Sequence, residues 1–172
     1  IRNATLNVYN NSDNSLVSQT TIIIGGVANS VVGIVVNLVD GVYTWFYNLF
    51  DMAGNSALSG NNTFTVDSIK PLISLISPVS GILTNNSVVS LVINATDNNP
   101  GNLTCSFYWN GNLNTGYGAA NGMNTTLQTS IWSDNLYRWN VTCADVAGNL
   151  NTTGTWNFTV DTTGPAVTLN YP

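Results

Sequence analysis

The sequence repeats itself with a spacing of 94 residues. "DMAGN" at 51–55 returns as "DVAGN" at 145–149, and "FTVD" at 64–67 returns at 158–161. The same spacing relates Asp40 to Asp134, Tyr43 to Tyr137, Trp45 to Trp139, Pro71 to Pro165, Leu75 to Leu169 and Pro78 to Pro172. Chance does not hold one register over about forty residues, so the chain is a tandem repeat.

The register also predicts the domain organisation. Residues 69–163 form one full unit, and residues 1–68 form a first unit whose opening strands would lie before residue 1. Residues 164–172 are predicted to be the first strand of a following repeat or a donor strand. The segments "VDSIKP" at 66–71 and "VDTTGP" at 160–165 are short linkers, in which proline stops the preceding strand.

Apolar residues alternate with polar ones, which is typical of half-buried strands. In "VVSLVINAT" (88–96), for example, Val89, Leu91 and Ile93 share one face. The segments 103–109, 136–143 and 155–160 alternate in the same way, and clusters of Gly, Asn and Asp separate them. The pattern predicts an all-β fold of antiparallel β-sandwiches.

The segments "DGVY" (40–43) and "DNLY" (134–137) stand just before the strand of each unit that carries a tyrosine and a tryptophan. This is the place of a tyrosine corner, although a tight turn followed by a core tyrosine would look the same. With its D-x-AGN turns, F-T-V-D strands and Thr/Pro linkers, the chain resembles bacterial and archaeal Ig-like surface repeats. The resemblance implies tandem Ig-like sandwiches and an archaeal source, and the repeat register adds that the first unit is incomplete at its N-terminus.

The charge inventory excludes several functions. Only 6% of residues are charged, with one Lys, two Arg, eight Asp, and neither His nor Glu. A chain with net charge −5 and three cations does not neutralise a phosphate backbone, so nucleic acid is not an expected partner. Apolar runs are too short to span a bilayer. Without His or Glu the usual catalytic triads and zinc sites are not available, so we expect neither an enzyme nor a metal centre.

The repeated D-x-AGN phrase is predicted to be a turn that closes the hairpin between the penultimate and the last strand of each unit. Asp51 and Asp145 can accept hydrogen bonds from nearby backbone N–H groups, and Gly54 and Gly148 can adopt positive φ. A Ca²⁺ site at either aspartate is the less favoured alternative, because no dense D-x-D-x-D loop accompanies it.

Cys105 and Cys143 occupy the inward phase of strands that should be neighbours. They are predicted to form a disulfide, with two buried thiols as the alternative. If a five-residue insertion separates the units here, the counterparts of the cysteines are Leu6 and Leu49, which should pack together in the first unit.

Ten N-x-S/T sequons predict N-linked glycosylation. Strand alternation alone also places Asn and Thr two residues apart on one polar face. Asn94, Asn102, Asn140 and Asn157 lie on the predicted outward phase. The acceptor residues are Asn3, Asn10, Asn61, Asn85, Asn94, Asn102, Asn124, Asn140, Asn151 and Asn157.

These features predict a non-enzymatic structural repeat of an extracellular cell-surface or filament-forming protein. No cofactor is expected besides glycans. The expected partners are other copies or adjacent repeats in a head-to-tail assembly, because a strand with an apolar face at 165–172 needs a receiving sheet. The alternative is an adhesin module that binds carbohydrate or protein through Trp109, Tyr117 and Trp132.

Overall fold

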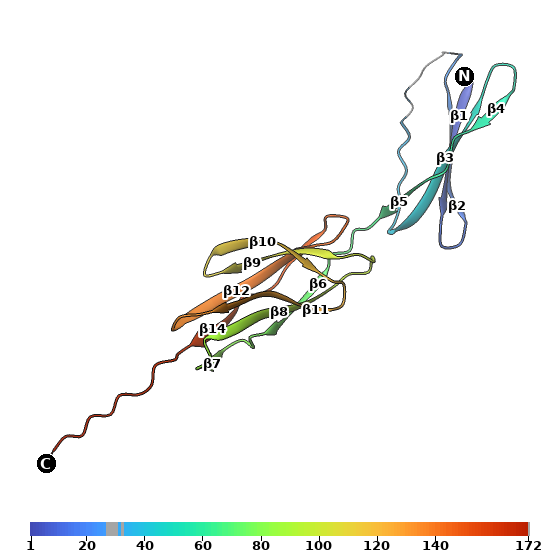
Figure 1. Cartoon of the computed structure of the whole chain (residues 1–172). Coiled ribbons are helices and arrows are strands. Elements are labelled where there is room, and N and C mark those ends of the chain that lie inside the picture. Colours follow the sequence, from blue (N-terminus) through green and yellow to red (C-terminus); the bar gives the residue numbers. More distant parts are fainter. Residues whose placement is uncertain (27–30, 32, 172) are drawn as a thin grey trace. The chain divides into compact units, whose positions relative to one another are not determined.

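The computed structural model describes residues 1–26, 31 and 33–171, and in this part of the chain every regular element is a β-strand (Figure 1). The chain divides into two compact units, Ile1–Ser68 and Ile69–Pro172. The all-β prediction is therefore confirmed. The described residues contain no helix that could cross a membrane.

The second unit consists of two sheets. Its strands are β6 (Leu72–Ser77), β7 (Ile82–Thr84), β8 (Val88–Thr96), β9 (Leu103–Trp109), β10 (Asn112–Ala119), β11 (Asn124–Ile131), β12 (Asn135–Ala144), β13 (Leu150–Thr152) and β14 (Trp156–Val160). One sheet has the order β10-β9-β12-β14-β7, with β13 also paired to β12, and the other has the order β11-β8-β6. All these pairs are antiparallel except β14 with β7, which is parallel.

One core joins the two sheets of this unit. Leu91 and Ile93 on β8 are completely buried, as the alternation of that strand predicts, and they share a cluster with Phe107, Trp139 and Phe158 of the larger sheet. Aromatic rings fill part of the core, where the ring centroid of Trp132 lies 4.7 Å from that of Tyr137 and 5.5 Å from that of Phe158. Apolar burial on this scale is the main stabilising contribution to the unit.

The first unit has one sheet in the described residues. Its strands are β1 (Asn3–Asn10), β2 (Leu16–Ile23), β3 (Gly41–Phe50), β4 (Ser56–Leu58) and β5 (Asn62–Val66). The order is β2-β1-β3-β4, and β5 also pairs with β3. By their order and pairing, β1 corresponds to β9, β2 to β10, β3 to β12, β4 to β13 and β5 to β14. The described part of the first unit is a single sheet, and it contains no counterparts of β6, β7 and β8.

An extended segment, residues 33–39, takes the place of β11 in the first unit, and we call it the strap. Ile34, Val36 and Leu38 are half-buried and pack against Leu6 and Val8 of β1, whereas the strap residues between them are exposed. Half-buried and exposed residues alternate along the strap as they do along a strand, but the strap is not a strand in the structure. Among the described residues, none of 33–38 takes part in a backbone hydrogen bond.

The pairing of β1 with β3 corrects the predicted counterparts of the cysteines. Leu6 lies opposite Tyr47, and Leu49 lies opposite Ala4. Cys105 lies opposite Cys143 in the second unit, so its counterpart is Ala4 and not Leu6. The two units therefore differ by seven residues at this point rather than five.

Residues 164–171, which we call the tail, form no strand in the structure (Figure 1). Their apolar side chains are almost fully exposed, at 84% for Val167, 88% for Leu169 and 95% for Tyr171. The alternation predicted for a strand is present in the sequence, but no described sheet receives it.

Candidate functional site: the apolar groove of the first unit

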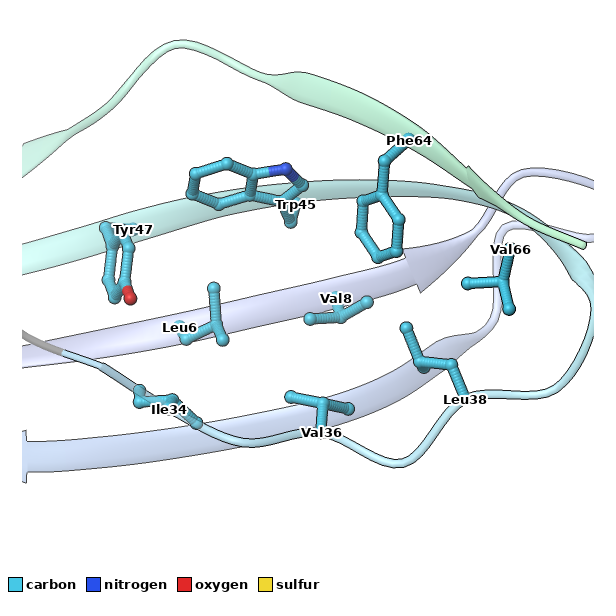
Figure 2. Close-up of a pocket in the computed structure, with 9 residues that line it drawn as sticks. All are labelled: Leu6, Val8, Ile34, Val36, Leu38, Trp45, Tyr47, Phe64 and Val66. Carbon is cyan, nitrogen blue, oxygen red and sulfur yellow. The ribbon is translucent and has the colours of Figure 1, made fainter. Parts of the chain in front are cut away.

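An open apolar groove of about 490 Å³ runs between the sheet of the first unit and the strap (Figure 2). The sheet contributes residues of β1, β3 and β5 on one side, and the strap contributes its half-buried residues on the other. The lining residues are Leu6, Val8, Ile34, Val36, Leu38, Trp45, Tyr47, Phe64 and Val66. None of them is charged, so the groove suits an apolar occupant and not an ionic ligand.

The groove is the exposed equivalent of the core of the second unit. By strand pairing, Leu6 corresponds to Phe107, Trp45 to Trp139 and Phe64 to Phe158. In the second unit these residues are 1% exposed, because the β11-β8-β6 sheet covers them. In the first unit Trp45 is only half-buried and Phe64 is 38% exposed. The groove marks the face from which a covering strand is missing in the described residues.

Tyrosine side chains hold the loop before β3 and the loop before β12 in the same way. The Tyr43 hydroxyl donates a hydrogen bond of 2.8 Å to the carbonyl of Val39, at the end of the strap. The Tyr137 hydroxyl donates a bond of 3.0 Å to the carbonyl of Ser133. Both bonds reach back four residues, which is the geometry of a tyrosine corner. The first of them anchors the strap over the groove.

The two D-x-AGN phrases form matching turns. Oδ1 of Asp51 accepts the Asn55 backbone N–H at 2.8 Å, and its Oδ2 accepts the Asn55 side-chain N–H at 2.8 Å. Asp145 accepts the equivalent two bonds from Asn149, each at 2.9 Å. Gly148 has φ of 93°, which a glycine adopts without strain. Each turn joins a long strand to a short one, β3 to β4 and β12 to β13, rather than to the last strand of the unit.

Hydrogen bonds lower the pKa of both turn aspartates. The Asn55 side chain and then its backbone N–H hold the pKa of Asp51 below its usual value. At Asp145, burial raises the pKa, but the bonds from the Asn149 side chain and backbone outweigh it, and the pKa is lowered. Both turns are therefore strongest with the carboxylate ionised.

The calcium alternative stays a prediction. A carboxylate oxygen of Asp97 lies within 4.8 Å of one of Asp145. Oδ2 of Asp97 is buried without a hydrogen-bond partner among the described residues. Hard cations favour such oxygens, but both carboxylate oxygens of Asp145 already accept hydrogen bonds within its turn.

Each linker is clamped by an aspartate at the same repeat position. Asp40 accepts bonds of 3.0 Å from the backbone and the hydroxyl of Ser68. Asp134 accepts bonds from Thr162 and from the Thr163 hydroxyl, the latter at 2.6 Å. Hydrogen bonds from Thr163 and then Thr162 lower the pKa of Asp134. The sequence analysis did not predict these clamps. The 94-residue spacing between Asp40 and Asp134 was the feature of the sequence that could have indicated them.

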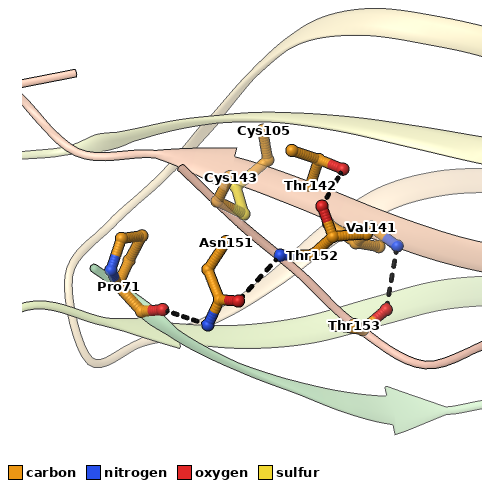
Figure 3. The surroundings of a disulfide bond; sticks show 8 residues. All are labelled: Pro71, Cys105, Val141, Thr142, Cys143, Asn151, Thr152 and Thr153. Atoms are coloured by element: carbon orange, nitrogen blue, oxygen red, sulfur yellow. Dashed lines mark hydrogen bonds between the residues drawn. A yellow bond between two sulfur atoms is a disulfide. The ribbon is translucent and has the colours of Figure 1, made fainter. Parts of the chain in front are cut away.

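The predicted disulfide is present in the second unit. Cys105 on β9 and Cys143 on β12 are directly opposite and joined, with an S–S distance of 2.05 Å, and both are completely buried (Figure 3). Beside them the Asn151 side chain donates a bond of 2.7 Å to the carbonyl of Pro71, so that it ties β13 to the start of β6 (Figure 3). The disulfide and this bond stabilise the end of the unit at which the chain enters.

The ten sequons differ in how accessible their asparagines are. Four have exposed side chains: Asn61, Asn85, Asn102 and Asn124. Six are half-buried: Asn3, Asn10, Asn94, Asn140, Asn151 and Asn157. Of the four residues expected on the outward phase, only Asn102 is exposed. Asn94 also donates to the Gly122 carbonyl and to Asn124 Oδ1.

The aromatic residues suggested as ligand contacts belong mainly to the core. Trp132 is 6% exposed, and its indole N–H donates to the carbonyl of Val89 at 3.0 Å. Trp109 and Tyr117 pack against the same core from partly buried positions. Trp109 and Trp132 nevertheless line a second groove, of about 410 Å³, together with Asn114 and Gln128. The three aromatic residues therefore do not form an exposed cluster, and ligand contact through them stays a prediction.

No family model matches the sequence, and no curated protein matches it. Solved structures that are similar at low identity include fibronectin(III)-like modules and two adhesin chains. The fibronectin(III)-like modules of CbhA from Clostridium thermocellum are 15% identical, with a TM-score of 0.47, over 97% of this chain and 83% of that one. A bacterial ice-binding adhesin is 21% identical, with a TM-score of 0.42, and the match covers 93% of this chain and 54% of that one. The tetra-tandem repeat from the extending region of a large adhesion protein is 18% identical, with a TM-score of 0.44, and the match covers 94% of this chain and 42% of that one. The chain thus spans about half or less of the two adhesin chains.

Proposed function

We propose that this chain is a non-enzymatic, Ig-like structural repeat of an extracellular surface or filament-forming protein, which joins copies or adjacent repeats head to tail. The observation that carries the proposal is that one set of structural contacts occurs twice at one spacing. The turn at Asp51 and Asp145, the corner at Tyr43 and Tyr137, and the linker clamp at Asp40 and Asp134 each repeat after 94 residues. Such duplication is characteristic of modular repeat chains.

The disulfide supports the extracellular setting. Disulfides persist mainly in oxidising compartments outside the cytosol, and the bond between Cys105 and Cys143 is part of the core. The near absence of charge supports glycosylation, because an uncharged surface with open sheet edges needs another means of preventing association. The archaeal source implied by the resemblance is retained as part of the proposal.

Immunogold labelling of intact cells that produce the protein tests this function. We expect gold on the outer surface, arranged along filaments or a layer, without permeabilisation. An antibody against a cytosolic protein of the same cells is the control and should label only permeabilised cells. Labelling of the chain only after permeabilisation would rule out a surface role.

Peptide mapping by mass spectrometry tests glycosylation separately. The exposed residues Asn61, Asn85, Asn102 and Asn124 should carry added mass. Asn151 should not, because its amide nitrogen bonds the Pro71 carbonyl inside the unit. Unmodified peptides across all ten sequons would mean that the motif reflects strand alternation alone.

A second candidate function, ligand binding, is favoured by the groove of the second unit. Trp109 offers a partly exposed ring there, and the amides of Asn114 and Gln128 lie on the same groove. Aromatic faces with a few directed polar groups suit a carbohydrate. A glycan array probed with the native chain should then give a signal that Asn114→Ala reduces, whereas a blank array contradicts this function.

A further inference from the structure

We propose that the second unit binds an acidic sugar, a pyranose ring that carries a carboxylate, in a groove on the outer face of its larger sheet. This groove has a volume of about 570 Å³, and we call it the outer groove. It shares no lining residue with the groove beside Trp109 and Trp132. The inference goes beyond the proposed function, because a structural repeat needs no ligand at this place.

The outer groove is built by side chains that point away from the core. The inward residues of β12 are buried, so the residues between them, Leu136, Arg138 and Asn140, lie on the outer face. Tyr108 on β9 lies opposite Asn140 and is 38% exposed. All four residues line the outer groove. Side chains at diagonal positions on paired strands lie about 7–8 Å apart, so Tyr108 and Arg138 can contact one ligand.

Arg138 supplies the positive charge of the outer groove. It is one of three cationic side chains in the whole sequence, and it is exposed. Its guanidinium has neither an ion-pair partner nor a hydrogen-bond partner among the described residues. The nearest aspartate in the sequence, Asp134, is bonded to Thr162 and Thr163 instead. The planar guanidinium therefore presents its N–H donors to solvent, in a geometry that matches a carboxylate.

Two amide side chains add neutral donors to the same groove. The side-chain oxygen of Asn110 accepts the backbone N–H of Arg138 at 2.9 Å, and that of Asn135 accepts the N–H of Leu136 at 2.8 Å. These bonds hold the amides in place and leave their side-chain N–H groups for a ligand. Amide donors beside the exposed ring of Tyr108 suit the hydroxyls and the apolar face of a sugar.

The first unit has different residues at the equivalent place. Thr44 stands where the second unit has Arg138, at the spacing of 94 residues. Opposite Thr44 lies Tyr9, whose ring stacks on Phe46 with 5.9 Å between the ring centroids. The shared plan of the two units therefore requires the turns, the tyrosine corners and the linker clamps, but it does not require the residues of the outer groove. A role that belongs to the second unit alone explains this difference.

Two sources can supply the acidic sugar. One is a glycan of the chain itself, because Asn140 is a predicted acceptor and lines the outer groove. The other is a glycan of another molecule. Both would place the same chemistry against Tyr108 and Arg138, and the experiment distinguishes them.

Titration of the full chain with methyl β-D-glucuronide tests the site, with amide chemical shifts as the measurement. Methyl β-D-glucoside has the same ring without the carboxylate and is the matched control ligand. We expect the glucuronide to bind at least about tenfold more tightly, because its carboxylate forms charge-assisted bonds with Arg138. The shifts should centre on the amides of residues 108–111 and 135–140. Equal affinities, or shifts centred elsewhere, would overturn the proposal.

Variants of the outer groove separate charge from stacking. Arg138→Gln should abolish the preference for the glucuronide and leave glucoside binding within about twofold. Tyr108→Ala should weaken both sugars alike, by at least about threefold, because it removes the ring on which they lie. Arg2→Gln removes the same charge from the first unit and should change neither affinity by more than about twofold. If Arg2→Gln abolished the preference as Arg138→Gln does, the attraction would be non-specific and the site would be refuted.

Glycosylated protein from its own cells identifies the source. Thr142→Ala removes the sequon at Asn140 without changing a residue that lines the outer groove. If the chain's own glycan fills the groove, only Thr142→Ala should bind added methyl β-D-glucuronide. If the sugar comes from another molecule, the wild-type chain should bind it equally well. Binding by neither protein would overturn the proposal. Surface labelling of cells does not depend on these results, so the structural function and the outer groove can fail separately.

Discussion

At the scale of single residues, the two units differ most at the disulfide. The counterparts of Cys105 and Cys143 are Ala4 and Leu49, which lie opposite each other on β1 and β3 without a covalent bond. The disulfide closes a segment with a sequence separation of 38 residues. Restricting a loop of that length in the unfolded chain stabilises the folded state by about 4 kcal/mol in the chain-entropy estimate.

We therefore predict that Cys105→Ala/Cys143→Ala lowers the free energy of unfolding of the second unit by about 4 kcal/mol. Urea denaturation followed by tryptophan fluorescence measures the change, because four of the five tryptophans belong to this unit. Reduction of the wild-type chain should cause a similar loss and serves as the control. An unchanged urea midpoint after complete reduction would contradict the prediction.

A pH dependence follows from the turn aspartates. The pKa values of Asp51 and Asp145 are lowered by folding, so their stabilisation is complete above the unfolded value of about 3.9 and is lost as the pH falls through that value toward the folded pKa. We predict that Asp145→Asn makes the stability of the second unit less sensitive to pH between about pH 5 and pH 2.5. Urea midpoints across this range measure it, with Asp51→Asn as the matched control that should leave the second unit unchanged.

At the scale of elements, the strap depends on a single anchoring bond at its end. Tyr43→Phe removes the hydrogen bond to the Val39 carbonyl and should cost the first unit about 0.5–1.5 kcal/mol. Hydrogen exchange should show faster exchange of the β3 and β5 amides around it. Tyr137→Phe is the matched variant, and its effect should be confined to the second unit. Destabilisation of the second unit by Tyr43→Phe, or of the first unit by Tyr137→Phe, would contradict the assignment of the two tyrosine corners.

The strands that the sequence predicted are those with long alternation. Segments 88–96 and 103–109 became β8 and β9 with the predicted faces inward, because burial of one face sets that period. Alternation shows which side chains share one face of a strand, but it does not show which strands pair with each other. Ile34, Val36 and Leu38 alternate as well, yet the strap is unpaired because the strand that would lie beside it is absent from the described residues.

The same limit explains the wrong register at the cysteine counterparts. Five and seven residues differ by two, and a shift of two keeps every side chain on its face. The alternation around Leu6 therefore fits either alignment, and only the pairing of β1 with β3 distinguishes them. The groove was beyond prediction for a related reason, since its shape depends on which strands cover which face.

At the scale of the molecule, the two units should differ strongly in stability although they share one plan. Seventeen hydrophobic residues form the buried cluster of the second unit, against three in the cluster of the first among the described residues. Each fully buried large apolar side chain contributes about 1.5–3 kcal/mol, so the difference in core outweighs any single hydrogen bond. The disulfide stabilises the second unit further.

We predict that the first unit opens independently of the second, with amide exchange at least about a hundredfold faster at matched positions. Trp45 and Trp139 make the clearest comparison, because they stand at the same repeat position on β3 and β12 and are half-buried and 1% exposed respectively. Exchange should be measured at concentrations where the chain is monomeric, so that association does not protect either unit. Equal protection of the two units in the monomer would contradict the prediction, because it would mean that the first unit is stabilised by something other than its small buried cluster.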